Sequence, residues 1–288
     1  MSYIDLHTHT LLSDGEFPAE TLIRMAEKEG IGHLALTDHN RIHTDIGELQ
    51  RSFPNIELIS ASEISAVYDT ADGQTKEIHI VGLFLEQTEE LCRFLADNCE
   101  NGYDRMTKML EKLTACGIEL DCHSGEAFRD MYYPNRKFVG RRHLAEVLVK
   151  RGYVPSIDAA MEKYIGEHGE RLAYVPNAFH FADMKHVVDM IHRASGTAVL
   201  AHPFSYKLSQ EELIRLLSYF KSLGGDAMEV QYGKYTKDMC CKLEELAEQY
   251  SFLPSCGSDF HGNRIDDRLD HKFSSTYLEA LRSAKYKK

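Results

Sequence analysis

The sequence of 288 residues lacks any apolar run long enough to span a membrane. A transmembrane helix needs about 18 or more consecutive, predominantly apolar residues. The first residues, MSYIDLHTHT, also lack the basic region and the apolar region that make up a secretory signal peptide. We therefore expect a cytoplasmic protein that makes no contact with a membrane.

Paired cysteine motifs are absent as well. The seven cysteines are odd in number and include no CxxC pair. The pattern therefore predicts neither a disulfide framework nor a zinc site built from thiolates.

The sequence also lacks an excess of positive charge, since its formal net charge is −12. Broad binding to duplex nucleic acid depends on cationic side chains that neutralise phosphates, so this composition argues against it. A small phosphorylated substrate is still compatible with the composition, since bound divalent cations reverse the local field.

Short β-rich segments alternate with helical patterns along most of the chain. The candidate strands are 3–6, 33–37, 56–64, 77–85, 197–201, 227–231 and 252–255. Apolar residues at helical spacing predict helices over 18–28, 209–223 and 237–250. This alternation indicates parallel pairing in an α/β sheet or barrel.

One region breaks the alternation. From about residue 89 to about residue 182 the patterns are helical, with candidate helices 103–116, 143–151 and 157–165. We therefore expect one domain formed by 1–88 and 183–288, with 89–182 inserted as a helical cap. Basic residues gather in the insert: Arg129, Arg136, Lys137, Arg141, Arg142, Lys150 and Arg151. They are either solvated surface charges or a cap that presents cations to a phosphate.

Nitrogen and oxygen ligands for metals recur on the candidate strands and in the loops that follow them. The set comprises His7, His9, Asp14, His39, Glu63, His79, His202, Asp259 and His261. Residues i and i+2 lie on the same side of a strand, so His7 and His9 can bind one ion together. Because the carboxyl ends of parallel strands converge on one face, all nine side chains should point into one cavity.

Imidazole and carboxylate ligands without thiolate suit Zn²⁺, Mn²⁺ or Fe²⁺. Nine ligands exceed what one ion needs, so we expect two or three divalent ions, with a carboxylate such as Glu63 between two of them. Clustered ions bind a phosphoryl group and generate a hydroxide nucleophile near neutral pH. One HxH pattern alone is commonly structural, but its recurrence at several strand ends favours a multinuclear site.

The motifs HTHTLLSDG, LTDHN, SASEIS, HIVGLF, LAHPF and GSDFHG resemble, in order, those of the PHP (polymerase and histidinol phosphatase) family. The resemblance spans residues 4–262. It implies a distorted (β/α)7 TIM-like barrel, a trinuclear metal site and phosphoesterase activity. It further implies three ion sites: one held by His7, His9, Glu63 and Asp259, one by Glu63, His79 and His202, and one by Asp14, His39 and His261. Family branches differ at position 14, where some have histidine. The candidate catalytic residues are accordingly Asp14, His39, His202, Asp259 and His261.

The insert resembles that of bacterial PHP enzymes that act on nucleotides. Its segments RMTKMLEKLTACGIEL, GRRHLAEVLVKRGYV and KYIGEHGERLAYVP carry this resemblance. Those enzymes remove the 3′-phosphate from 3′,5′-nucleoside bisphosphates such as pAp, and some trim short RNA from its 5′ end. The resemblance implies that Arg141 and His143 contact the substrate phosphate that is not hydrolysed, while Arg142 replaces the commoner proline. A planar guanidinium is well matched to a phosphate.

We therefore expect a metal-dependent phosphoesterase that uses a metal-activated hydroxide on the 3′-phosphate of a 3′,5′-nucleoside bisphosphate. Three alternatives stay open. A histidinol-phosphate phosphatase would need an acidic group for the substrate amine rather than an arginine-rich cap. A 5′→3′ exonuclease on short RNA would use the same metals. A catalytically inactive PHP module is disfavoured by the complete set of ligands.

Overall fold

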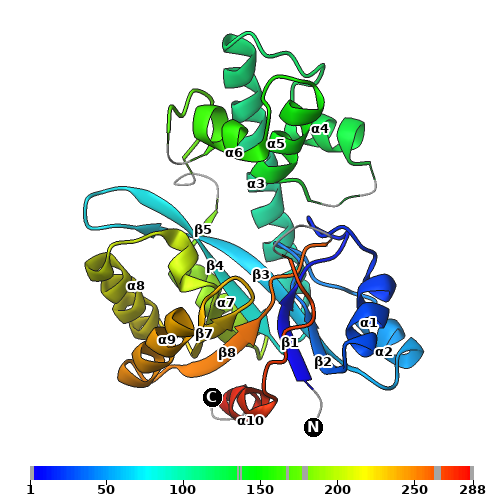
Figure 1. Ribbon diagram of the computed structural model, residues 1–288, viewed down its shortest axis with the longest axis vertical. Helices are drawn as coiled ribbons and strands as arrows, with labels where there is room; N and C mark the ends of the chain where they lie inside the picture. The colour runs from blue at the N-terminus through cyan, green and yellow to red at the C-terminus, as the bar shows by residue number, and fades with distance from the viewer. Residues whose placement is uncertain are drawn as a thin grey trace.

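The computed structural model describes residues 3–134, 136, 138–166, 169–176, 181–262 and 267–285, so Lys137 of the basic set lies outside the described residues. Figure 1 shows the chain in two tiers, a sheet with flanking helices below and a group of helices above. Within the described residues, no helix is both long enough and apolar enough to cross a membrane.

Seven of the strands form a nearly closed, barrel-shaped sheet in the order β1-β2-β3-β4-β6-β7-β8. Their bounds are Tyr3–Thr8, Ile31–Leu36, Glu57–Asp69, Thr75–Leu83, Thr197–Leu200, Ala227–Tyr232 and Leu253–Gly257. A parallel bridge between Thr8 and Phe260 links the two edges. Within the described residues, the two-residue strand β5 (Ala182–Asp183) pairs with β3 alone. The expected distorted seven-stranded barrel is confirmed, and each candidate strand corresponds to one of its strands.

One expectation about the sheet is wrong, because β4 runs antiparallel to both of its neighbours, β3 and β6. The reason is the length of the connection between β3 and β4. Asp69 pairs with Thr75, so residues 70–74 form a hairpin turn, and a parallel crossover needs a dozen or more residues. Consequently His79 reaches the site from the middle of a reversed strand and not from a carboxyl end.

Helices cover the outside of the barrel on two sides (Figure 1). Helices α1 (Ala19–Lys28) and α2 (Ile46–Ser52) pack beside β2, and α7 (Met184–Arg193), α8 (Gln210–Ser222) and α9 (Lys237–Gln249) lie on the other side. The predicted helices over 18–28, 209–223 and 237–250 are confirmed as α1, α8 and α9. The sequence pattern did not identify α2, which buries a single residue, Leu49.

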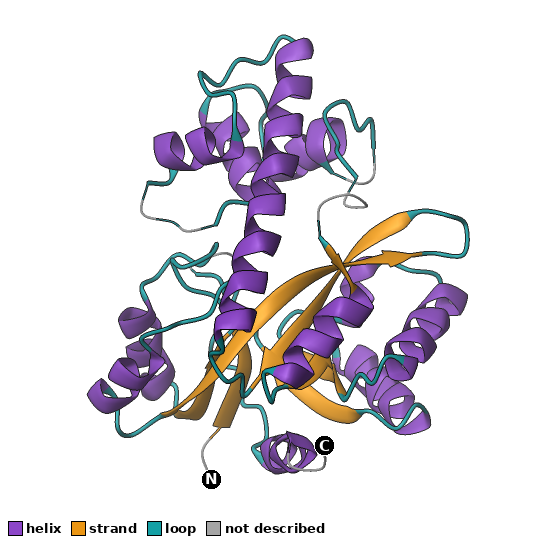
Figure 2. Cartoon of the chain, turned by 180° about the vertical axis from the view of Figure 1, so that it is seen from behind, coloured by secondary structure: helices purple, strands orange, loops and turns teal. Residues whose placement is uncertain are grey.

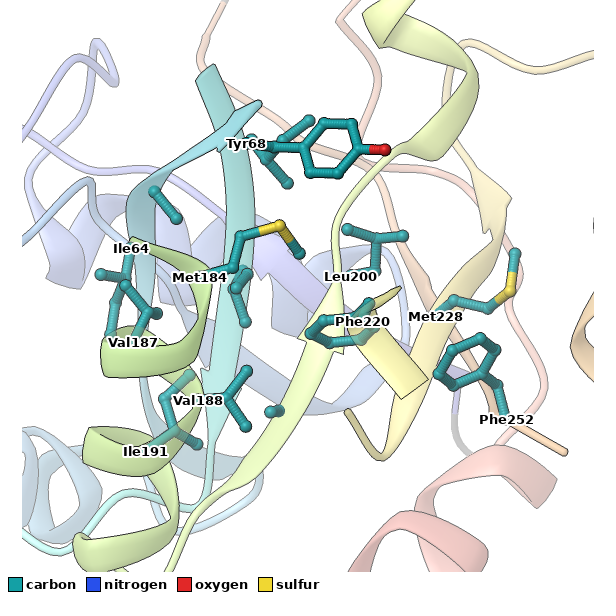
Figure 3. Packing of buried hydrophobic residues seen from close by; sticks show 14 of the residues in the cluster. Ile64, Tyr68, Met184, Val187, Val188, Ile191, Leu200, Phe220, Met228 and Phe252 are labelled. Carbon is teal, nitrogen blue, oxygen red and sulfur yellow. The ribbon is translucent and has the colours of Figure 1, made fainter. Parts of the chain in front are cut away.

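Apolar side chains fill the space between the sheet and these helices. Figure 3 shows part of the largest such cluster, in which Ile64 of β3 lies beside Val187 of α7, and Leu200 of β6 lies beside Phe220 of α8. A separate cluster joins residues of most strands to Leu278 and Leu281 of α10 (Thr276–Lys285), the helix at the lower end of the barrel in Figure 1. This lower end is therefore closed by hydrophobic packing, which leaves the opposite end for chemistry.

The upper tier consists of α3 (Glu89–Ala115), α4 (Gly125–Tyr132), α5 (Arg141–Lys150), α6 (Ile157–Ala160) and the π-helical turn η1 (Met161–Ile165). Figure 2 shows α3 running from beside the sheet into this group. Its 27 residues make a helix about 40 Å long. The group has an apolar core of its own, including Phe128, Leu144 and Leu148, distinct from those of the barrel. We call these helices the cap; the limits 89 and 182 of the insert stay a prediction.

Candidate metal centre

All nine candidate ligands lie together at the end of the barrel that faces the cap. Each has an imidazole nitrogen or a carboxylate oxygen within 3.3 Å of such an atom in another member of the set. They come from β1, β3 and β4 and from the segments that follow β1, β2, β6 and β8. The fold therefore converts ligands spread over some 250 positions into one cluster.

Glu63 of β3 lies at the centre of this cluster and is 1% exposed. Its Oε2 lies 3.3 Å from Nε2 of His7, 3.3 Å from Nε2 of His9 and 3.0 Å from Nδ1 of His39. A single carboxylate oxygen thus faces three imidazoles from two different strands.

The other oxygen of Glu63 faces two further imidazoles. Oε1 lies 2.9 Å from Nδ1 of His79 and 2.9 Å from Nε2 of His202. Because one carboxylate cannot balance five imidazolium charges, most of these rings must be neutral or a cation must replace their protons. An arrangement with a carboxylate between two groups of imidazoles is that expected for a bridging ligand.

Several buried nitrogen and oxygen atoms of this cluster lack hydrogen-bond partners, and they show whether metal ions fit here. Among the described residues, no hydrogen-bond partner meets Nε2 of His7, Nε2 of His9, Nδ1 of His79 or Oε2 of Glu63, although all are buried. An unsatisfied buried polar atom is costly, about 1–3 kcal/mol each. The donors are nitrogen and oxygen without thiolate, which suits Zn²⁺, Mn²⁺ or Fe²⁺. The residues present therefore fit divalent ions, whose identity stays a prediction.

The geometry groups the ligands in three overlapping sets. These are His7, His9, Glu63 and Asp259; His9, Asp14, His39 and His261; and His39, Glu63 and His79, with the ligand atoms of each set within 4.8 Å of one another. The first contains the four residues implied by the family resemblance. In the second, His9 joins the three expected residues. In the third, His39 takes the place expected for His202. His202 still contacts Glu63, with its Nε2 2.9 Å from Oε1, and its ring centroid lies 5.3 Å from that of His79. Which residues share an ion stays a prediction.

Two of the ligands sit on backbone in the left-handed region, where a residue other than glycine is uncommon. His202 has φ 28° and follows β6, and Asp259 has φ 54° and follows β8. Such a conformation costs on the order of 1 kcal/mol or more and persists where the surroundings fix it. Gly257 is required for a different reason, because a Cβ there would lie 2.2 Å from Cβ of His7. The backbone conformation of His202 and Asp259 and the lack of space at Gly257 are local reasons for the LAHPF and GSDFHG motifs.

Asp38, which precedes His39, fastens the loop that carries His9 and Asp14. Its Oδ1 accepts hydrogen bonds from the backbone N–H of Thr10 and of Ser13, at 2.9 Å each. Its Oδ2 lies 2.9 Å from Nε2 of His43. Burial raises the pKa of Asp38, but the bond to His43 and the neighbouring positive charge outweigh it and lower the pKa to about 2. The carboxylate therefore stays charged and keeps this loop fixed at neutral pH.

The cap touches the same loop through Arg136. Its Nη1 donates to the carbonyl oxygen of Ser13 at 2.9 Å and to that of Gly15 at 2.6 Å. These two carbonyls flank Asp14, so the cap contributes directly to the position of a candidate ligand.

Strand β7 carries none of the nine candidates, yet it holds ligands from other strands. Oε1 of the buried Glu229 lies 2.7 Å from Nδ1 of His7, and its Oε2 accepts the backbone N–H of His202 at 2.6 Å. The hydroxyl of Tyr232 donates to Oδ2 of Asp259 at 2.6 Å. A carboxylate on the far nitrogen fixes the tautomer and orientation of a ligating histidine. The sequence signal was available, since Glu229 is the one charged residue in the strand AMEVQY.

Glu229→Gln is therefore expected to weaken binding of the ion next to His7 by about 10–100-fold, the usual effect of losing such a partner. The amide keeps the shape of the side chain but removes the negative charge that favours the required tautomer. Calorimetric titration with Mn²⁺ measures the affinity. Glu245→Gln, on the exposed face of α9, is the matched control. An affinity equal to that of the unsubstituted protein would show that Glu229 has no orienting role.

A cavity of about 570 Å³ extends from the metal ligands into the cap. Asp14, His39 and His79 line its barrel end, and its cap end is lined by the apolar residues Met106, Met109, Phe138, Val139, Met161 and Phe181. Four basic residues lie in the same wall: Arg105, Arg141, Arg142 and Lys207. An apolar part beside cations is the composition expected of a site for a base and a phosphate.

Two arginines of this wall share one carboxylate. Glu77 Oε2 lies 3.2 Å from Nη1 of Arg105 and 3.0 Å from Nη2 of Arg141, and Glu77 Oε1 lies 3.3 Å from Nε2 of His79. Arg105 is 5% exposed, and among the described residues its Nη2 has no hydrogen-bond partner. Burial and the neighbouring Arg141 lower the pKa of Arg105 to about 10.

Neither Arg105 nor Glu77 was among the residues expected from the sequence. Arg141 lines the cavity, and its contact with a substrate phosphate stays a prediction. The signal for Arg105 is its position seven residues after Asn98, another polar residue on the buried face of α3. The described residues that line the cavity do not include His143. It is 2% exposed and its Nδ1 accepts the backbone N–H of Gly140 at 3.0 Å. Contact between His143 and the substrate stays a prediction.

Comparison with known proteins gives consistent findings. The model of the PHP domain matches residues 5–233. The "5′-3′ exoribonuclease Rnm" of Escherichia coli is 35% identical over 261 residues, which are 89% of this chain and 84% of that protein. The "3′,5′-nucleoside bisphosphate phosphatase" of Chromobacterium violaceum is 31% identical over 268 residues, 91% of this chain and 88% of that protein.

A solved structure is similar over almost the whole chain. It is described as an amidohydrolase from Chromobacterium violaceum with bound sulfate and no metal. The TM-score is 0.81 at 27% identity, with 98% of this chain and 96% of that chain covered. The likeness includes the cap as well as the barrel, because the match leaves few residues of either chain outside it.

Proposed function

This chain belongs to the PHP family of metal-dependent phosphoesterases, and on that premise we propose that it removes the 3′-phosphate from a 3′,5′-nucleoside bisphosphate. The named relatives are hydrolases that act on phosphoesters, and this chain is a phosphoester hydrolase as well. The proposal concerns the substrate, for which the relatives' names offer both a bisphosphate and RNA.

The observation that carries the proposal is the arginine pair in the cavity wall. Arg105 and Arg141 share the carboxylate of Glu77, so this group of three side chains carries one net positive charge close to the metal ligands. The buried Nη2 of Arg105 still requires an acceptor. A phosphate oxygen supplies both the negative charge and the acceptor, and guanidinium–phosphate bonds are among the strong ones. A substrate with a second phosphate therefore suits this wall better than a monophosphate.

The reaction is hydrolysis of a phosphomonoester at the metal centre. Divalent ions held by the nine ligands would neutralise the phosphoryl oxygens and acidify a bound water. The cap arginines would bind the 5′-phosphate, and Met106, Met109 and Phe138 would contact the base. Glu229 and Asp38 would hold the ligands in their orientation. With both phosphates held, the substrate would be oriented for attack by water, which is the contribution that positioning makes to such reactions.

Arg141→Ala is expected to lower kcat/KM for adenosine 3′,5′-bisphosphate by about 10–100-fold, because it removes a charge-assisted hydrogen bond worth about 1.5–3 kcal/mol. The value for adenosine 3′-monophosphate should change little, since that nucleotide has no 5′-phosphate. Phosphate release with Mn²⁺ measures both.

Arg151→Ala is the matched control, because Arg151 is an exposed cap arginine outside the cavity, paired with Asp121. It should leave both substrates unaffected. Equal losses on the two nucleotides after Arg141→Ala would contradict a role in binding the second phosphate. Histidinol phosphate belongs in the same assay, and its preference over the bisphosphate would overturn the proposal.

A second candidate is removal of nucleotides from the 5′ end of short RNA. The favouring observation is that relatives named 5′-3′ exoribonucleases are 32–35% identical to this chain. The same cavity would hold the first nucleotide with its 5′-phosphate. The two candidates differ only in what is attached to the phosphate at the metal centre.

A further inference from the structure

A second cavity is also lined by the ion pair between Glu77 and Arg141. Its volume is about 290 Å³, and it is lined by Lys76, Glu77, His79, Arg141, His202, Ser205, Tyr206 and Lys207. Four of these residues, Glu77, His79, Arg141 and Lys207, also line the main cavity. The two cavities therefore share a wall, and each reaches candidate metal ligands, with His202 exposed to the second one alone.

The composition of the second cavity differs from that of the main one. Of its described lining residues, none is Leu, Ile, Val, Met or Phe. Its described lining contains three cationic side chains, Lys76, Arg141 and Lys207, and one carboxylate, Glu77, a basic composition in a protein whose net charge is −12. Such a wall suits an anionic, polar group and not a nucleobase alone.

The wall of the second cavity is held by hydrogen bonds and is not formed by loose surface side chains. The hydroxyl of Tyr206 accepts the backbone N–H of His79 at 2.9 Å and donates to the carbonyl of Ala201 at 2.8 Å. The backbone N–H groups of Phe204 and Ser205 donate to the hydroxyl of Tyr235 at 2.8 and 3.1 Å. The short helix η3 (Pro203–Tyr206) is thus fixed against β4 and β6, which keeps the second cavity preformed.

We propose that the second cavity binds the nucleotide that follows the scissile phosphate in a short oligonucleotide. Lys76 and Lys207 would contact the phosphate on the 3′ side of that nucleotide. The inference rests on the proposed function, because it takes the first nucleotide to lie in the main cavity with its 3′-oxygen at the metal centre. The phosphorus at the centre then bears the 5′-oxygen of the next nucleotide, which the second cavity receives.

The reaction is the same for both substrates, and water is the only other reactant. Water adds to phosphorus, the bond from phosphorus to the 3′-oxygen of the first nucleotide breaks, and a proton of the water ends on that oxygen. A bisphosphate yields inorganic phosphate, and an oligonucleotide yields a chain with a new 5′-phosphate. The first nucleotide leaves with its own 5′-phosphate and a free 3′-hydroxyl in both cases.

The test compares adenosine 3′,5′-bisphosphate with the 5′-phosphorylated trinucleotide pApApA. Lys76→Gln removes a cation that lines only the second cavity. Ser205→Asp places a carboxylate in the same wall and is the second variant, should the first fail to fold. Lys28→Gln, in the last turn of α1 and outside both cavities, is the matched control. All proteins are assayed with Mn²⁺, and all are also titrated with both nucleotides after chelator treatment, so that binding is measured even without turnover.

Lys76→Gln should lower kcat/KM for the trinucleotide by about 10-fold, the equivalent of one charge-assisted hydrogen bond, with the loss in KM. The bisphosphate should be unaffected, Ser205→Asp should act in the same direction and Lys28→Gln should act on neither. Equal effects on both nucleotides, or cleavage and binding of the trinucleotide that do not respond to either variant, would overturn the second cavity as a subsite. If the protein cleaves neither nucleotide, the proposed function fails, and weaker trinucleotide binding by the variants still supports the subsite.

Discussion

Replacing Glu63 by glutamine is expected to lower the rate of phosphate release by about 10³-fold and to reduce the number of metal ions bound per chain. The carboxylate oxygens lie within 3.3 Å of five imidazoles, so both are placed to serve ions on two sides. Glutamine keeps the size of the side chain but has no charge and only one oxygen. A loss of about 4 kcal/mol in transition-state stabilisation, within the range attributed to metal ions, corresponds to about 10³-fold in rate.

Glu57→Gln is the control for this variant, because Glu57 begins the same strand and is paired with Arg282 and His33 at the far end of the barrel. It should leave metal content and rate unchanged. Metal content by elemental analysis and phosphate release should be measured on the same preparations. A Glu63→Gln protein with normal metal content and normal turnover would exclude Glu63 as a bridging ligand.

Removal of metal is expected to lower the melting temperature by roughly 10 °C and to abolish hydrolysis. A ligand present at about 1,000 times its Kd stabilises the folded state by about 4 kcal/mol. For a chain of this size, 1 kcal/mol corresponds to about 2–4 °C. The buried atoms without hydrogen-bond partners are the structural reason, because ions satisfy them and the metal-free fold does not. Differential scanning calorimetry with a chelator, and then with added Mn²⁺ or Zn²⁺, measures the shift.

The difference in melting temperature between the metal-bound and the metal-free protein should increase between pH 7 and pH 9. Without metal, burial opposes the charged forms of His9 and His79. The nearby carboxylates, Asp259 and Glu63 for His9 and Glu63 for His79, outweigh burial and raise the pKa of each histidine to about 10. A pKa raised in the folded state adds stability that is full below the unfolded value, near 6.5, and is lost as the pH rises toward 10. Metal-bound imidazoles carry no such proton, so the metal-bound protein lacks this decline. A metal-induced shift that narrows with rising pH would contradict the assignment of these two histidines as ligands.

The sequence predicts much of the fold because its strands and helices are encoded by local periodicity. Alternating apolar residues and helical spacing identified all seven barrel strands and α1, α8 and α9. The direction of β4 was not accessible in the same way. It depends on residues 70–74, which close a hairpin between β3 and β4. The expected alternation of strands and helices assumed a longer, helical connection at this point.

In the site, too, some features follow from local sequence spacing and others only from the tertiary structure. Strand spacing placed His7 beside His9 and Asp259 near His261, since each pair lies two positions apart. The partner of His7 is Glu229, 222 positions away, and no local pattern links the two. Arg105 likewise becomes a candidate for phosphate binding only because α3 carries it from beside the sheet to Glu77 on β4.

By itself, then, the sequence determined the types of ligand, their positions on the strands and the metal-dependent chemistry that follows. The tertiary structure decided which ligands face one another, that Glu63 stands between two groups of imidazoles, and that His143 is used to hold the start of α5. It also decided that two cavities reach one centre. The physical reason is that ligand type is a property of single residues, whereas shared ions and shared walls depend on contacts between distant strands that closure of the barrel alone creates.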